Sequence, residues 1–125
     1  MALTNTWFYT KTIIDWKKLE ASTGNKFRVV TSRPYTDKKN KLSNGYTITL
    51  MVLEDSADYG IDKKTGLQRD NNQLQNFDVT ILSDSKPAPK KGDYISLSDF
   101  DSENSFAIGF DLILRFRDFQ KLKVG

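Results

Sequence analysis

The sequence contains no cysteine and no histidine. Without cysteine the protein has no disulfide, no thiolate metal ligand and no cysteine nucleophile. Without histidine it lacks the side chain that most often transfers protons or ligates metals near neutral pH. It also has no apolar run long enough to span a bilayer and no signal-peptide pattern. We therefore expect a soluble cytoplasmic protein with no cofactor and no membrane contact.

The composition fits one small domain with a compact core. A chain of 125 residues has room for a single core, and its 38% hydrophobic share indicates polar loops. The 8 Phe, 5 Tyr and 2 Trp residues are a large aromatic supply for such a core, so some are available for the surface. The 19 Lys and Arg residues against 16 Asp and Glu give a net charge of +3, which is compatible with binding a polyanion.

Alternating apolar and polar residues predict strands at 26–35, 46–53, 76–82, 94–98 and 105–117. In the first strand, Phe27 and Val29 share one face, and the other carries Arg28, Val30 and Ser32. The last strand is the longest, with a bend or bulge expected at Gly109. Its apolar face consists of Phe106, Ile108, Phe110, Leu112, Leu114 and Phe116. Residues 4–10 are also β-prone and could pair with a sheet edge.

The connections and one short helix have their own signals. Asn44-Gly45 predicts a hairpin turn. The polar connection 54–75 is too long for an ordinary loop, so we expect it to be poorly ordered or to project as a flexible hairpin. A capping-box pattern at residues 12–15 places Asp15 at the third position of a short helix that ends near Gly24. Its apolar residues Ile13, Trp16 and Leu19 have helical spacing, so we expect them to point inward.

Five strands in this order predict an all-β fold, a five-stranded antiparallel barrel of OB type with one short N-terminal helix, in a single domain over residues 1–125. One departure is that Pro87 and Pro89 leave no room in residues 83–91 for the helix that OB barrels usually place between strands three and four. The N-terminal helix is available to plug the barrel end instead. Residues 118–125 are expected to form a short basic C-terminal end.

Four segments resemble, in their order, the motifs of the bacterial single-stranded DNA-binding protein family. They are residues 47–50, 62–66, 77–82 and 91–97. Together with the connections between them, these segments cover about half of the chain. The family shows a strand ending in T-L-x, a loop with D-x-x-T-G, a strand with an early aromatic, and K-G-x-x-V-x-[IV]. The resemblance implies an OB-fold protein that binds single-stranded DNA without sequence preference and forms a homo-oligomer, a dimer or a tetramer.

The size, the basic ending and the missing helix are similar to phage-encoded members of the family, such as those of phages of lactic-acid bacteria. This implies a role in phage DNA replication or recombination in the host cell cytoplasm, with phage replication or recombination proteins as possible partners. The family's acidic tail is absent, because the sequence ends in residues 121–125, Lys-Leu-Lys-Val-Gly. Recruitment of repair enzymes through such a tail is therefore not expected.

Binding of single strands requires cations for phosphates and exposed aromatic faces for bases. Basic residues gather in the first hairpin, the long connection and the corner before residue 94. Among the aromatic residues, Tyr94 points away from the core face. Tyr59 and Phe77 fall near positions where the family stacks bases. Phe77 is included for that position, although its alternation with Val79 and Ile81 favours the core. The residues predicted to bind single-stranded DNA are Arg28, Arg33, Tyr35, Lys38, Lys39, Lys41, Tyr59, Lys63, Lys64, Arg69, Phe77, Lys90, Lys91 and Tyr94.

Two other functions remain open at this stage. The first is an OB-type module that binds RNA or a protein, for which the basic groove would not be a DNA-binding site. Asp99, Asp101 and Glu103 have the spacing of a Mg²⁺ or Ca²⁺ site, which would suit a nuclease, but a solvated acidic turn is the favoured interpretation. No nucleophile or paired-carboxylate arrangement stands out, so we expect a protein that is not an enzyme and holds no metal.

Overall fold

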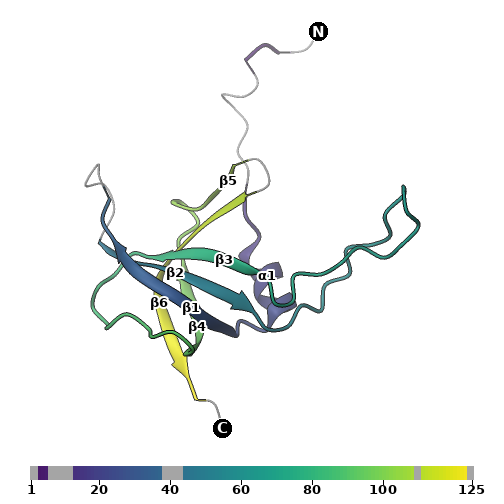
Figure 1. Cartoon of the computed structure of the whole chain (residues 1–125). Coiled ribbons are helices and arrows are strands. Elements are labelled where there is room, and N and C mark those ends of the chain that lie inside the picture. The colour runs from purple at the N-terminus through teal and green to yellow at the C-terminus, as the bar shows by residue number, and fades with distance from the viewer. Residues whose placement is uncertain (1–2, 6–12, 38–43, 109–110, 124–125) are drawn as a thin grey trace.

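The computed structural model describes residues 3–5, 13–37, 44–108 and 111–123 (Figure 1). The predicted strand at residues 4–10 lies mostly outside these residues. The chain is mostly β, with one short helix. Its elements are α1 (Trp16–Thr23), β1 (Phe27–Tyr35), β2 (Gly45–Val52), β3 (Asn76–Ile81), β4 (Tyr94–Phe100), β5 (Phe106–Ile108) and β6 (Asp111–Leu122).

Five of the strands form a ring that closes nearly into a barrel. The sheet order is β3-β2-β1-β4-β6-β5, and an additional parallel pairing of β3 with β6 joins the two sides. All other pairings among the described residues are antiparallel, and within them β5 pairs with β6 alone. The predicted all-β near-barrel with one N-terminal helix is confirmed, and the ring is compatible with an OB barrel. No described helix is long and apolar enough to cross a membrane.

The core lies inside the ring, and alternate residues of each ring strand supply it. Fully buried side chains come from all five strands, among them Phe27, Ile48, Val79, Ile95 and Phe116. Burying each such side chain contributes about 1.5–3 kcal/mol, so the pleat alternation read from the sequence is also what stabilises the ring. Residues 82–93, all of them described, contain no helix, as the two prolines predicted.

Helix α1 covers one opening of the ring. Its Trp16 ring meets Phe116 edge-on at a centroid distance of 4.8 Å and stacks on Phe100 at 6.1 Å. The predicted position of Asp15 is wrong by one turn. Asp15 is the N-cap, whose side chain accepts a hydrogen bond from the Lys18 amide at 3.0 Å. Because the helix begins only after it, Ile13 does not follow the helical spacing and is 80% exposed rather than inward.

The turn predicted at Asn44-Gly45 is also wrong. Gly45 is the first residue of β2 and pairs with Tyr35, so the connection comprises residues 36–44. A glycine is required here by close approach, because a Cβ atom would lie only 1.7 Å from the Ile81 carbonyl oxygen of β3. Within this connection, residues 38–43 lie outside those described, and with them the predicted binding residues Lys38, Lys39 and Lys41.

The long last strand predicted at 105–117 is wrong, because the chain reverses within it. Phe106 of β5 pairs with Ile113 of β6, and Ile108 pairs with Asp111. Directly opposed residues share a face, so the apolar residues before and after the reversal lie on different faces. The predicted bend residue Gly109 lies outside the described residues. Strand β6 continues to Leu122, and Phe119 is buried, so residues 118–122 belong to the ring rather than to a basic end.

Strand β1 has a register shift between Val29 and Thr31, which corrects its predicted faces. Before the shift, Phe27 and Val29 point into the core, as predicted. After it, Ser32 pairs with the buried Ile48 and lies on the core side, not on the face of Arg28. A β-bulge inserts one residue and so reverses the alternation that follows it. The second half of β1 therefore presents its odd-numbered side chains outward.

Candidate nucleic-acid interface

The register shift brings three predicted binding residues onto one surface. Arg28 lies opposite Met51 of β2, Arg33 opposite Thr47 and Tyr35 opposite Gly45, all on the outer side of the sheet. Without the shift, Arg33 and Tyr35 would lie on the same face of β1 as the buried Phe27. We call the outer side of β1, with Arg28, Thr31, Arg33 and Tyr35, the β1 face.

At one end of the β1 face, a cation lies over an aromatic ring. The Arg28 guanidinium carbon is 5.8 Å from the centroid of the Tyr94 ring, and Arg28 pairs with Tyr94 where β1 meets β4. Tyr94 is half-buried and lies on the opposite side of β4 from the buried Ile95. The exposed Lys90 and Lys91 lie four and three residues before Tyr94. This end therefore combines positive charge with an aromatic surface.

The acidic group nearest to these lysines in sequence is already engaged. One oxygen of Asp93 accepts a hydrogen bond from the Lys90 amide at 2.9 Å and lies 3.6 Å from the Lys121 ammonium. The negative charge of Asp93 is thus partly balanced by Lys121, and it subtracts little from the positive end formed by Arg28, Lys90 and Lys91.

Arg33 and Tyr35 form the other end of the β1 face. Arg33 lies 3.5 Å from Asp78 of β3, with both side chains more than half exposed. The second Asp78 oxygen accepts a hydrogen bond from the Thr49 hydroxyl. An ion pair this exposed contributes about 0–1 kcal/mol, so Arg33 can exchange Asp78 for a phosphate at little cost. Tyr35 is half-buried where β1 runs into the connection 36–44.

The outer side of β2 and β3 is chemically different. Its paired residues are Thr47 with Thr80, Thr49 with Asp78 and Met51 with Asn76, with no cation and no aromatic ring among them. Phe77 lies on the core side, and its ring centroid is 5.2 Å from that of Phe27. Phe77 is therefore not on the surface that carries the other predicted residues, and among β1, β2 and β3 the cations lie on β1.

Residues 54–75 project from the ring as a hairpin (Figure 1), and the flexibility expected for them stays a prediction. An isolated bridge joins Ile61 to Gln68, and the Arg69 amide donates to the Gly60 carbonyl at 2.9 Å. We call this segment the arm. It carries the predicted residues Tyr59, Lys63, Lys64 and Arg69, but its five carboxylates outnumber its three cations. In Figure 1 its tip points away from the ring, so the structure does not bring the arm cations together with the β1 face.

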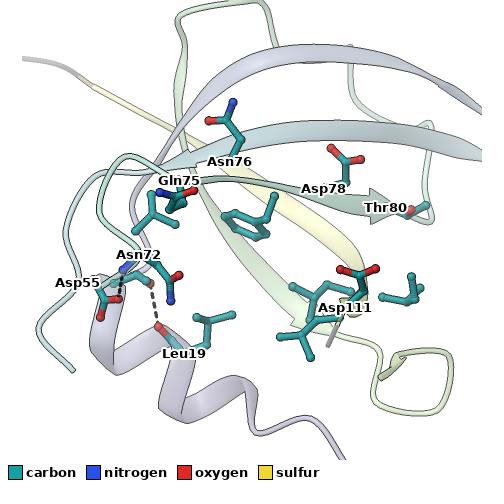
Figure 2. Close-up of a pocket in the computed structure, with 14 residues that line it drawn as sticks. Leu19, Asp55, Asn72, Gln75, Asn76, Asp78, Thr80 and Asp111 are labelled. Atoms are coloured by element: carbon teal, nitrogen blue, oxygen red, sulfur yellow. Dashed lines mark hydrogen bonds between the residues drawn. The ribbon is translucent and has the colours of Figure 1, made fainter. Parts of the chain in front are cut away.

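A hydrogen-bond network around Asp55 holds the base of the arm. Its carboxylate accepts from the Tyr59 hydroxyl at 2.7 Å, the Asn72 amide at 2.8 Å and the Ala57 amide at 3.1 Å, and the Asn72 contact is drawn in Figure 2. Burial alone would raise the pKa of Asp55, but these hydrogen bonds outweigh it and lower the pKa. Burial, together with donation to Asp55, raises the pKa of Tyr59.

The network predicts that acid loosens the arm. The lowered pKa of Asp55 means that its stabilisation is complete above the usual value of 3.8 and is lost as the pH falls through the lowered value. Asp55→Asn should remove about 1 kcal/mol of local stability, because the group is partly solvated. Amide hydrogen exchange should become faster at Ala57 and Asn72 and stay unchanged in β1 and β2. Equal exchange in the variant and the wild type would contradict this role.

The acidic turn does not resemble a metal site. Asp101 is only 6% exposed and accepts hydrogen bonds from the Asn104 amide group at 2.7 Å and from Arg117 at 3.1 Å. Burial would raise its pKa, but these partners lower it. The favoured interpretation of a solvated turn is therefore wrong for Asp101, which fixes the turn between β4 and β5. Within the described ranges, no group of three acidic side chains could hold a metal ion.

Beside the arm lies a cavity of about 640 Å³ (Figure 2). Side chains of α1, β2, β3 and β6 line its apolar part, among them Leu19, Val52, Phe77 and Leu114. Its polar lining contains three carboxylates, Asp55, Asp78 and Asp111, and no cation. Negative charge at this opening disfavours phosphate, so the cavity does not extend the β1 face.

A second contact between an arginine and an aromatic ring has no signal in the sequence. Arg115 lies over Phe106 at 5.6 Å and donates to the Asn104 carbonyl at 2.7 Å. Both residues fall within the single strand predicted at 105–117, in which they would lie far apart. Only the reversal between β5 and β6 brings them together.

Comparison with known proteins gives no relative for this arrangement, since no family model, no curated protein and no solved structure matches the chain.

Proposed function

We propose that the protein is an OB-type single-stranded DNA-binding protein that acts without sequence preference in phage DNA replication or recombination. The observation that supports this best is the β1 face, where a register shift aligns Arg28 and Arg33 between Tyr35 and Tyr94. Cations along a surface with aromatic rings at its ends are what a backbone and its unstacked bases require. Binding involves no chemical step.

The dimensions of the β1 face suit a short stretch of nucleic acid. At about 3.3 Å per residue, the distance along β1 from Arg28 to Tyr35 is about 20 Å. That is of the order of the shortest sites, since an OB fold covers about 4–16 nucleotides. Lys90 and Lys91 at one end would lengthen the cationic path, and the predicted binding residues Lys38, Lys39 and Lys41 follow Tyr35 in the sequence.

Single strands fit this surface better than duplex DNA. Tyr35 and Tyr94 are half-buried rings that only an unstacked base can cover. The β1 face presents neither a projecting helix nor a two-stranded ribbon, the elements that enter a major groove. By coating exposed strands, such a protein would prevent reannealing and present the DNA to phage replication or recombination proteins, as a homo-oligomer with one site per chain.

One observation favours a second function. The outer side of β2 and β3, the usual oligonucleotide surface of OB barrels, lacks cations and aromatic rings here. This would suit an OB-type protein-interaction module, or an RNA-binding module that uses β1 alone. Competition between DNA and RNA oligonucleotides distinguishes these functions from the proposed one.

Tyr94 gives a direct test of the stacking contact. Tyr94→Ala should weaken binding to oligo-dT by about 1–3 kcal/mol, the usual contribution of one base stacked on an aromatic ring. Tyr94→Phe keeps the ring and its contact with Arg28 and should bind as the wild type does. Fluorescence anisotropy with labelled oligo-dT measures both. Full binding by Tyr94→Ala, with an unchanged melting temperature, would remove Tyr94 from the interface.

A further inference from the structure

The β5–β6 hairpin is apolar on both of its sides. Phe106 and Ile108 lie on one side and are 40% and 60% exposed, while Leu112 on the other side is 47% exposed. A two-stranded ribbon is at best marginally stable in water by itself. Apolar side chains exposed to water on both of its sides do not stabilise it further. These exposed groups indicate that the hairpin is covered in the functional protein.

The outer edge of β5 is open to pairing. Strand β5 ends the sheet order, so within the described ranges no strand pairs with its second edge. Its residues Phe106, Ala107 and Ile108 include no charge and no proline. The edge of β1 beyond its pairing with β4 is different, because it carries Arg33 and Pro34. Charges and prolines are how proteins protect edge strands from pairing with another chain, and β5 lacks both.

We propose that β5 pairs antiparallel with β5 of a second copy of this chain, about a two-fold axis at Ala107. This register places Phe106 opposite Ile108 of the second copy, and the two-fold repeats the contact. Both large apolar side chains then lie on one face of a four-stranded sheet in the order β6-β5-β5-β6. The strand is thus complementary to itself, which favours a second copy over an unrelated protein. A two-fold contact of this kind closes at a dimer.

This inference stands independently of DNA binding, because it rests on the apolar hairpin and its open edge alone. The β1 face lies on strands that do not pair with β5. A dimer formed through β5 would therefore leave both β1 faces free.

The mass of the protein in solution tests the interface. Size-exclusion chromatography with light scattering should give twice the 14.3 kDa chain mass for the wild type and the monomer mass for Ile108→Asp. The matched control is Leu67→Asp, at a 69% exposed position in the other projecting hairpin, which should remain a dimer. A monomeric wild type at all concentrations, or a dimer that Ile108→Asp leaves intact, would overturn the proposal.

Crosslinking tests the register. The chain has no cysteine, so Ala107→Cys introduces a single thiol at the proposed two-fold axis. Directly opposed residues of antiparallel strands have Cβ atoms about 4.5–5.5 Å apart, close enough for a disulfide after a small shift. Mild oxidation should convert Ala107→Cys to a covalent dimer and leave Leu67→Cys monomeric on a denaturing gel. Equal crosslinking of both variants, or none at 107, would contradict this register.

Discussion

Replacing Phe116 with alanine should lower the free energy of unfolding by about 3–5 kcal/mol. Phe116 is fully buried, and its ring lies 4.8 Å from Trp16 and 5.3 Å from Phe100. It therefore joins β6 to both α1 and β4, and its removal would leave a cavity where the helix covers the ring. Because a small domain has about 5–15 kcal/mol of stability in total, this loss would unfold a large part of the population.

Urea denaturation followed by tryptophan fluorescence measures this change, since Trp16 packs directly on Phe116. The control is Leu67→Ala, which removes an exposed side chain and should cost less than about 0.5 kcal/mol. A loss below about 1 kcal/mol for Phe116→Ala would mean that the helix does not seal the core at this position.

Reversing the two arginines of the β1 face should nearly abolish the proposed DNA binding. Each phosphate contact with a single strand contributes about 0.7 to the slope of log affinity against log salt. Loss of two contacts then lowers affinity on the order of 50-fold at about 50 mM salt, before any repulsion from the new carboxylates. The variant is Arg28→Glu with Arg33→Glu, and anisotropy titration with labelled oligo-dT measures it.

A control of equal charge separates local contacts from net charge. Lys17→Glu with Lys18→Glu makes the same change in net charge on exposed positions of α1, away from the β1 face. It should keep most of the affinity for oligo-dT. Equal weakening by both double variants would show that overall charge, and not the β1 face, determines binding.

Strands with one buried face could be predicted from the sequence. In β2, β3 and β4 the alternation of residues such as Ile48, Val79 and Ile95 corresponds directly to burial, because one side of each faces the core. Helix α1 was predicted from its capping residues, but its start was displaced because Asp15 can serve either as N-cap or in the first turn. In these cases local chemistry determines local structure.

The end of the chain, from residue 105 onward, could not be predicted in this way. Every second residue from Phe106 to Phe116 is apolar, which is the pattern of one strand. A chain reversal inside such a run leaves this alternation of residue types unchanged. Only the cross-strand partners of Phe106 and Ile108 reveal it. Phe116 and Phe119 are both buried, although strict alternation would put them on opposite faces of β6. Their partners in β4 are Phe100 and Leu97, and Asp99 between these two has a positive φ of 55°.

The candidate interface shows the same limit. Residue type and place in the predicted strands and loops identify Arg28, Arg33, Tyr35 and Tyr94 as candidates. Their common surface depends on the register shift in β1, which no composition or spacing signals. Phe77 illustrates the reverse case, because its parity favoured the core, where the structure places it against Phe27.

Competition between nucleic acids for the wild-type protein tests whether it binds single-stranded DNA. Labelled oligo-dT bound to the protein is titrated with unlabelled single-stranded DNA, duplex DNA and RNA, at about 50 mM and about 200 mM salt. Single-stranded DNA should compete best, and affinity should fall steeply between the two salt concentrations, as release of counterions requires. Affinity that barely changes with salt, or duplex DNA that competes as well as single strands, would contradict it.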